Sequence, residues 1–236
     1  MKTTSSLLVI LLIASLSVNA QQAFHAEPSI QGTTFFEANS ATVNRMPFAP
    51  AKSTVGTRFL FADWAKATVI DNSGSSFSNG LFNFDKVGQN LYMQLPDTNA
   101  VLHVNKQDIK SVTLTDGTVT YVLKKVSALD TNKFYNALVE GDRYSLYRFT
   151  KTSFIPSDYT SNGIVTSGNL YDEYKDEITY YVIFPNGSVR ETSLKKKSVK
   201  NLFGSEKAKV DNFFKAFSGE TFDENMLTLL VQNMNQ

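Results

Sequence analysis

Hydrophobic and polar residues alternate along most of the middle of the chain. Between residues 58 and 193, short alternating runs are separated by Asp, Asn, Gly and Pro residues. A period of two is typical of strands that bury one face. The runs lie at 65–70, 81–85, 91–95, 101–104, 109–115, 118–126, 144–149, 178–184 and 188–192. No crossover helix separates them, which favours antiparallel pairing.

Two of the intervening turns predict hairpins. Asp116-Gly117 joins two of the runs and suits a two-residue turn of type I′. Pro185-Asn186-Gly187 joins the last two runs and predicts a second hairpin.

After Ser193 the period changes to that of a helix. We predict one helix over 195–203, a second capped by Ser205, and a third that begins with the capping-box pair Thr221 and Glu224. The apolar positions of the last two are Val210, Phe213, Phe214 and Phe217, then Met226, Leu227, Leu230 and Met234. Short helices are marginal alone, so these must pack on the sheet. The predicted fold class is α+β, mainly β: about eight to ten short strands in an antiparallel sheet, sandwich or partly open barrel, then a pair or trio of helices.

The first 20 residues have the features of a signal peptide. Lys2 precedes an apolar run over 7–18, and cleavage is expected between Ala20 and Gln21. We therefore predict an exported, periplasmic or extracellular protein that does not span a membrane after cleavage. The expected organisation is a leader (1–20), an irregular lead-in (21–57), an antiparallel β domain (58–194) and helices packed on it (195–236).

The amino-acid composition narrows the range of possible functions. The chain of 236 residues contains no cysteine, which excludes disulfides, thiolate metal sites, a cysteine nucleophile and a lipid-modified N-terminal cysteine. The protein is thus expected to be soluble and not a lipoprotein. Removing the leader with Lys2 leaves equal numbers of basic and acidic residues, which gives no general attraction for nucleic acid.

The inventory of catalytic groups is poor. The chain has two histidines, His25 and His103, and neither has the spacing of a catalytic triad. We predict no catalytic residue, no metal site and no cofactor. The basic run of Lys195, Lys196, Lys197 and Lys200 is interpreted as a solvated helix face.

Two features are candidate ligand contacts. Trp64 is the only tryptophan and precedes the first clear strand, where it can be a ligand platform or a core anchor. An acidic and tyrosine-rich segment can offer paired carboxylates beside a stacking surface, or can be a solvated loop. The candidates there are Tyr171, Asp172, Glu173, Tyr174, Asp176 and Glu177.

Several segments carry a resemblance to a known group of proteins. They are the stretch Leu60–Val69, the run Leu81–Asp85, Leu91 in the next strand, and Leu202-Phe203 and Leu229-Leu230 in the tail. Together they resemble uncharacterised secreted β-rich proteins that are common in Bacteroidetes-type bacteria. The resemblance implies a periplasmic or secreted protein and carries no activity or catalytic residue.

Three hypotheses on function follow. The first is a non-enzymatic exported binding or envelope-associated protein, because aromatic residues are abundant and catalytic groups are few. The second is a glycan-active hydrolase that uses the clustered carboxylates. The third is a periplasmic carrier of lipid or lipoprotein. The partner is unknown, with an envelope protein, a glycan or a lipid as the candidates.

Overall fold

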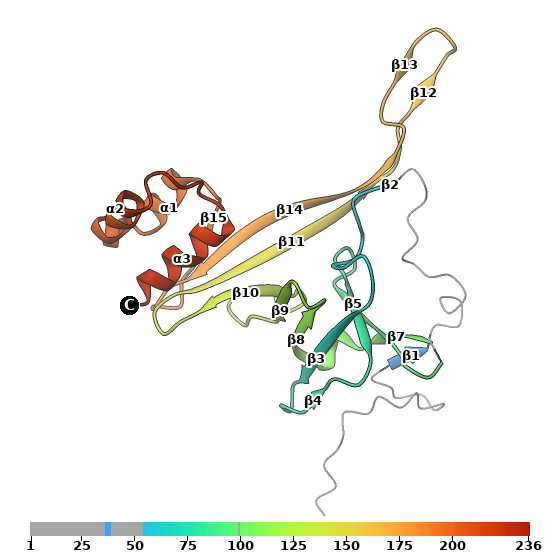
Figure 1. Ribbon diagram of the computed structural model, residues 1–236, viewed down its shortest axis with the longest axis horizontal. Coiled ribbons are helices and arrows are strands. Elements are labelled where there is room, and N and C mark those ends of the chain that lie inside the picture. Colours follow the sequence, from blue (N-terminus) through green and yellow to red (C-terminus); the bar gives the residue numbers. More distant parts are fainter. Residues whose placement is uncertain (1–35, 39–53, 99) are drawn as a thin grey trace, which may run out of the picture.

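The structure is a computed structural model that describes residues 36–38, 54–98 and 100–236. It is mainly β, with a large open sheet followed by three short helices (Figure 1), which confirms the predicted fold class. The expected cleavage site at Ala20 and Gln21 lies outside the described residues.

Eleven strands form one hydrogen-bonded path, and every pairing along it is antiparallel. In spatial order they are β1 (Phe36–Ala38), β7 (Val101–Val104), β6 (Asn90–Gln94), β5 (Leu81–Asp85), β3 (Ala65–Asp71), β8 (Ile109–Thr115), β9 (Thr120–Lys124), β10 (Tyr135–Glu140), β11 (Ser145–Ile155), β14 (Asp172–Ile183) and β15 (Val189–Thr192). The path ends at β1 and β15, so the sheet is open.

Four shorter strands complete the β structure. β2 (Thr54–Val55) pairs with β14 in parallel, which makes the large sheet mixed, and β4 (Ser76–Phe77) pairs with β3. β12 (Thr160–Ser161) and β13 (Thr166–Ser167) form a separate two-stranded sheet. A 3-10 turn, η1 (Lys106–Asp108), leads into β8.

The first half of the sheet packs around its own core. In β3 the small and branched residues Ala65, Ala67 and Val69 are buried, whereas Lys66 and Thr68 between them are exposed. This is the alternation that a half-buried strand requires. The same core contains the buried residues Phe82, Phe84, Leu91, Met93, Leu102, Val104, Ile109, Val112, Leu114, Leu123 and Phe134.

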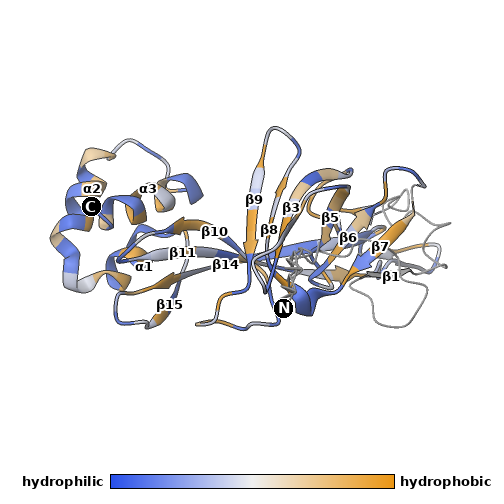
Figure 2. Cartoon of the chain, turned by 90° about the horizontal axis from the view of Figure 1, so that it is seen from below, coloured by the Kyte–Doolittle hydropathy of each residue, from blue (hydrophilic) through white to orange (hydrophobic). Residues whose placement is uncertain are grey.

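A second core lies between the other end of the sheet and the helices α1 (Lys196–Leu202), α2 (Lys207–Ala216) and α3 (Glu224–Met234). Figure 2 shows α2 and α3 with both hydrophobic and hydrophilic stretches, and α3 contacts β10 and β11. The apolar stripes of α2 and α3 are buried against Leu146 and Val182 of the sheet.

The helix starts differ from the predicted ones. Ser205 lies in the 3-10 turn η2 (Gly204–Glu206) and caps no helix, because α2 begins without a side-chain cap. The cap of α3 is Asp223, whose carboxylate accepts a hydrogen bond from the Met226 amide at 2.9 Å. Thr221 is therefore not the capping residue.

Both predicted hairpins are present. The β14–β15 turn contains Gly187 at a φ of 76°. The β8–β9 turn contains Gly117 at a φ of 94° but spans residues 116–119, because the last strand pair is Thr115 with Thr120. The loop expected there had two residues, Asp116 and Gly117, whereas the loop in the structure has four.

Candidate functional site

Two long strands, β11 and β14, extend beyond the rest of the sheet. They pair without interruption from Ser145 with Ile183 to Ile155 with Glu173. Strand β10 pairs with β11 only as far as Arg148, and β15 pairs with β14 only from Tyr180 onward. The remaining seven pairs form a ribbon about 23 Å long, which projects from the body of the molecule (Figure 1). We call residues 149–179 the arm and residues 156–171 the arm tip.

Cross-strand side-chain pairs support the arm along its length. Phe154 and Tyr174 are register partners, and their ring centroids lie 5.0 Å apart. Lys151 faces Glu177, with 3.7 Å between ammonium and carboxylate. Such pairs are the side-chain contribution to a ribbon whose only neighbouring strand among the described residues is the short β2, beside Asp172 and Glu173.

Hydrogen bonds from side chains to the backbone order the arm tip. The Asp172 carboxylate accepts from the Ser157 amide at 2.7 Å, and the Asp158 carboxylate accepts from the Asn169 amide at 2.7 Å. At the far end, the Asn162 side chain accepts from the Ile164 and Val165 amides. The tip is thus a defined hairpin built by turn chemistry.

Large hydrophobic side chains are concentrated at this hairpin and its junction with the arm. Seven of the fifteen exposed large hydrophobic residues that the structure describes lie within residues 154–171. Ile164 is 92% exposed, Leu170 67% and Val165 62%. The others are Phe154, Ile155, Tyr159 and Tyr171. A cluster of exposed apolar groups in one element is typical of an interaction site.

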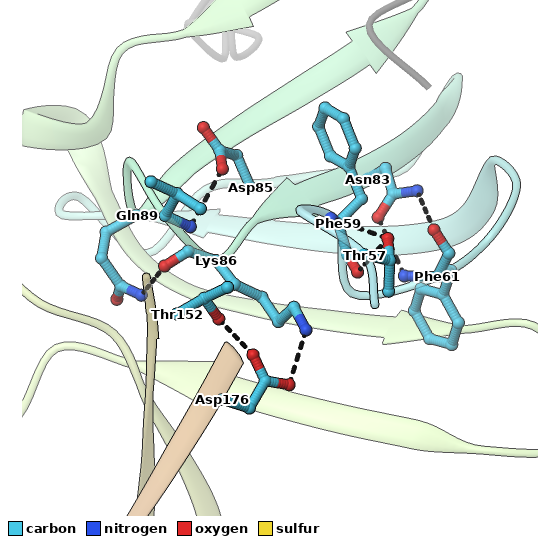
Figure 3. Close-up of polar contacts among 10 residues, drawn as sticks. Thr57, Phe59, Phe61, Asn83, Asp85, Lys86, Gln89, Thr152 and Asp176 are labelled. Carbon is cyan, nitrogen blue, oxygen red and sulfur yellow. Dashed lines mark hydrogen bonds and ion pairs between the residues drawn. The ribbon is translucent and has the colours of Figure 1, made fainter. Parts of the chain in front are cut away.

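The base of the arm is held by an ion pair between segments far apart in the sequence. The Lys86 ammonium lies 2.7 Å from the Asp176 carboxylate, which also accepts a hydrogen bond from the Thr152 hydroxyl at 2.5 Å (Figure 3). The Lys86 side chain is only 9% exposed. This cation therefore depends on Asp176 for its charge partner.

A second polar group supports the loop that carries Lys86. Asp85 is fully buried and binds the Arg58 guanidinium at 2.7 Å, and this hydrogen bond raises the pKa of Arg58 above its usual value. Asn83, also fully buried, accepts from the Phe61 amide and donates to the Phe61 carbonyl (Figure 3). Both residues belong to the 81–85 run. The alternation of hydrophobic and polar residues in that run did not indicate that these two polar side chains are buried and hydrogen-bonded.

The acidic candidates lie on a strand and not on a loop. Within β14, Asp172 and Asp176 share one face, and Glu173 and Glu177 share the other. Two carboxylates on the same face are four residues, or about 13 Å, apart along the strand. Hydrolysis of a glycosidic bond needs two carboxyl groups at about 5 to 9.5 Å. The strand therefore does not present the paired carboxylates that the sequence suggested.

The aromatic candidates are divided between two parts of the sheet. Tyr171 is exposed at the end of the arm tip, and Tyr174 is half-buried in the arm. Trp64 is half-buried at the entrance to β3, and four strands lie between β3 and β14 in the sheet order. Trp64 thus belongs to the first half of the sheet and not to the arm.

A small void lies between the first half of the sheet and the start of the arm. It measures about 20 Å³ and is lined by residues that include Phe84, Tyr121, Phe134 and Arg148. This is room for about one water molecule. Within the part of the chain that the structure describes, no group of three His, Asp or Glu residues could hold a metal ion.

Among the described residues, no helix has the length and apolar character needed to cross a membrane. Comparison with protein-family models, with curated proteins and with solved structures finds nothing that matches this chain. The resemblance to secreted Bacteroidetes proteins therefore stays a prediction, and function has to be argued from the site itself.

The arm tip is the part of this site that sequence reasoning missed. Its apolar residues do not alternate with polar ones over a long run, so the sequence pattern did not predict a strand there. A local signal was present, because the turn dipeptide Asn162-Gly163 follows Tyr159-Thr160-Ser161 and precedes the strand-forming residues Ile164 and Val165.

Proposed function

We propose that the protein is an exported, non-enzymatic binding protein whose arm tip docks on a partner protein of the cell envelope. The observation that carries this proposal is the cluster of exposed apolar side chains on a hairpin that projects from the body. Burying Ile164, Val165 and Leu170 in a partner would contribute about 1.5–3 kcal/mol each if burial were complete.

The charge of the arm tip defines the chemistry of the partner. Between Lys151 and Lys175 the chain has no basic residue, and its charged groups are Asp158, Asp172 and Glu173. An anionic lipid surface would repel this end of the molecule. The complementary partner is a protein with an apolar cleft and a polar or basic rim.

The two alternatives receive less support from the geometry. A hydrolase would need two facing carboxyl groups, and β14 places its acidic side chains on opposite faces or about 13 Å apart. A lipid carrier would need an apolar cavity of about 300–1,000 Å³. The interior void beside Phe84 and Phe134 measures about 20 Å³.

Photo-crosslinking tests the proposal directly. A photoreactive amino acid at Ile164 should give a discrete adduct with one envelope protein when the purified chain is added to envelope fractions. The matched control is the same group at Val119, which is 44% exposed at another hairpin tip. Adducts of equal yield from both positions, or none from Ile164, would contradict the proposal.

Substitution gives the second arm of the test. Replacing Ile164 and Leu170 together by serine should abolish binding of the partner identified by the crosslink and leave the circular dichroism spectrum unchanged. The control V119S should retain binding. Full binding by the I164S/L170S variant would exclude the arm tip as the docking element.

A further inference from the structure

The C-terminal helices form a concave surface that is separate from the arm. Its volume is about 740 Å³, and it is lined by Lys196, Lys197, Lys200, Asn201, Gly204 and Lys207. Four of these six residues carry a positive charge. The basic run that the sequence suggested to be a plain solvated face is therefore one wall of a hollow.

The local fold brings these cations together. Lys196 and Lys200 are one helical turn apart on α1, and Lys197 and Asn201 form the adjacent row. The turn η2 then reverses the chain, so that Lys207 at the start of α2 faces the same hollow. Gly204 lies between them, with open space where a Cβ would be.

Two of the lysines are held in place by the protein. The ammonium groups of Lys196 and Lys200 lie 5.6 and 5.5 Å from the centre of the Phe214 ring. Lys200 also pairs with Asp211 at 2.7 Å, and this bond lowers the pKa of Asp211 below its usual value. One wall of the hollow is thus ordered before any ligand arrives.

The positive charge there is only partly neutralised within the described part of the chain, by Asp211. Lys197 and Lys207 form no ion pair with another described residue. Residues 195–217 contain seven lysines and two carboxylates, although the chain without its leader has no net charge. Like charges held this close repel one another, and a bound anion would relieve the repulsion.

We infer that this hollow is a binding site for a phosphate group, carried by a soluble phosphate compound or by a lipid headgroup. Lysine binds phosphate as a compact point charge, whereas planar carboxylates are matched best by the arginine fork. The described residues that line the hollow include four lysines and no arginine. This site does not depend on the function proposed for the arm.

Calorimetry with inorganic pyrophosphate at constant ionic strength tests the soluble source. We expect saturable binding that weakens by about tenfold in the variant K197Q/K207Q, because two exposed ion pairs are lost. The matched control is K66Q/K110Q, which removes the same charge from exposed positions on β3 and β8. It should change the affinity by less than about twofold.

Co-sedimentation with vesicles tests the lipid source. The full chain should bind to vesicles that contain phosphatidylglycerol, and the K197Q/K207Q variant should not. Neither protein should bind to vesicles of phosphatidylcholine alone. Binding to pyrophosphate identifies a soluble phosphate, and binding to anionic vesicles alone identifies a headgroup. Either result supports a phosphate site.

Three outcomes would overturn the inference. They are no saturable binding to either probe, an equal loss in K197Q/K207Q and K66Q/K110Q, or equal binding of chloride at the same ionic strength. The I164S/L170S variant should retain phosphate binding. Failure of the arm proposal and failure of this one are therefore measured separately.

Discussion

Two glycines of the arm tip have the same backbone conformation and different surroundings. Gly163 and Gly168 both have a φ of 83°. A Cβ at Gly168 would overlap the carbonyl oxygen of Asp158, whereas a Cβ at Gly163 would meet open space. We expect G168A to destabilise the tip by about 1–3 kcal/mol and G163A by about 1 kcal/mol.

Hydrogen exchange of the tip amides measures this difference. Exchange at the Asn169 amide should be faster in G168A than in G163A, because that amide is bonded to Asp158. Thermal unfolding of the body should change little in either variant. Equal exchange in the two variants would contradict the crowding at Gly168.

The ion pair at the base of the arm predicts a contrast between neighbouring carboxylates. Asp176 is the charge partner of Lys86, whose side chain is 9% exposed, whereas Glu177 pairs with the 66% exposed Lys151. We expect D176N to lower the free energy of unfolding by about 1–3 kcal/mol, because a nearly buried cation is left unpaired. E177Q should lower it by less than about 0.5 kcal/mol. Urea denaturation measures both, and similar losses would show that Lys86 does not depend on Asp176.

At the scale of elements, two tyrosines connect the sheet to the helical tail. The Tyr144 hydroxyl donates to Glu206, and the Tyr180 hydroxyl donates to Glu224 at 2.8 Å. Burial, reinforced by the bonded carboxylate, raises the pKa of Tyr144 to about 12, and the pKa of Tyr180 is raised in the same way. In the folded protein both tyrosines therefore favour the neutral form.

This shift predicts a loss of stability at alkaline pH. The folded pKa is above the unfolded value of about 10. The stabilisation is therefore complete below pH 10 and is lost as the pH rises through about 12. The free energy of unfolding, measured with urea from pH 8 to 11.5, should fall above pH 10, and the fall should be smaller in Y144F. An identical fall in Y144F would show that Tyr144 makes no contribution.

Whether the sequence predicted an element depended on whether that element has a buried face. The strands around the first core alternate clearly, because Ala65, Ala67 and Val69 must be buried and Lys66 must not. The arm carries no such constraint, since no residue from Ser153 to Thr179 is buried. Backbone pairing and turn chemistry form it, and neither leaves a hydrophobic period in the sequence. This is why β11 and β14 extend well beyond the predicted runs.

The same reason explains why local sequence patterns did not predict the contacts of the acidic candidates. The four acidic candidates Asp172, Glu173, Asp176 and Glu177 all lie in one strand, β14. The sequence pattern grouped them by their closeness along the chain, whereas a period of two sends neighbours to opposite faces. The pairing of Asp176 with Lys86 joins positions 90 residues apart, and no local pattern contains that contact.

At the scale of the molecule, one continuous sheet joins two large hydrophobic cores and then extends into an arm without a large core of its own. The first core is built mainly by β3–β9, and the second by the helices with β10, β11 and β14. Eleven of the sixteen buried residues of the second core lie after Ser193. Deleting the arm tip and deleting the C-terminal helices should therefore have very different effects on the stability of the body.

Two deletions test this division. Replacing residues 156–172 with an Asn-Gly turn should leave the body folded, because that segment contains no buried residue and a two-residue turn fits the pairing of Ile155 with Glu173. We expect its melting temperature to stay within about 3 °C of the full chain, which corresponds to about 1 kcal/mol for a protein of this size.

Truncation after Thr192 should instead give an insoluble or molten product, because it removes most of the second core. Calorimetry and near-ultraviolet circular dichroism distinguish the outcomes. A cooperative transition in the truncated chain would show that the sheet is stable without its helices, and a large loss in the tip deletion would show that the arm tip serves the fold instead of a partner.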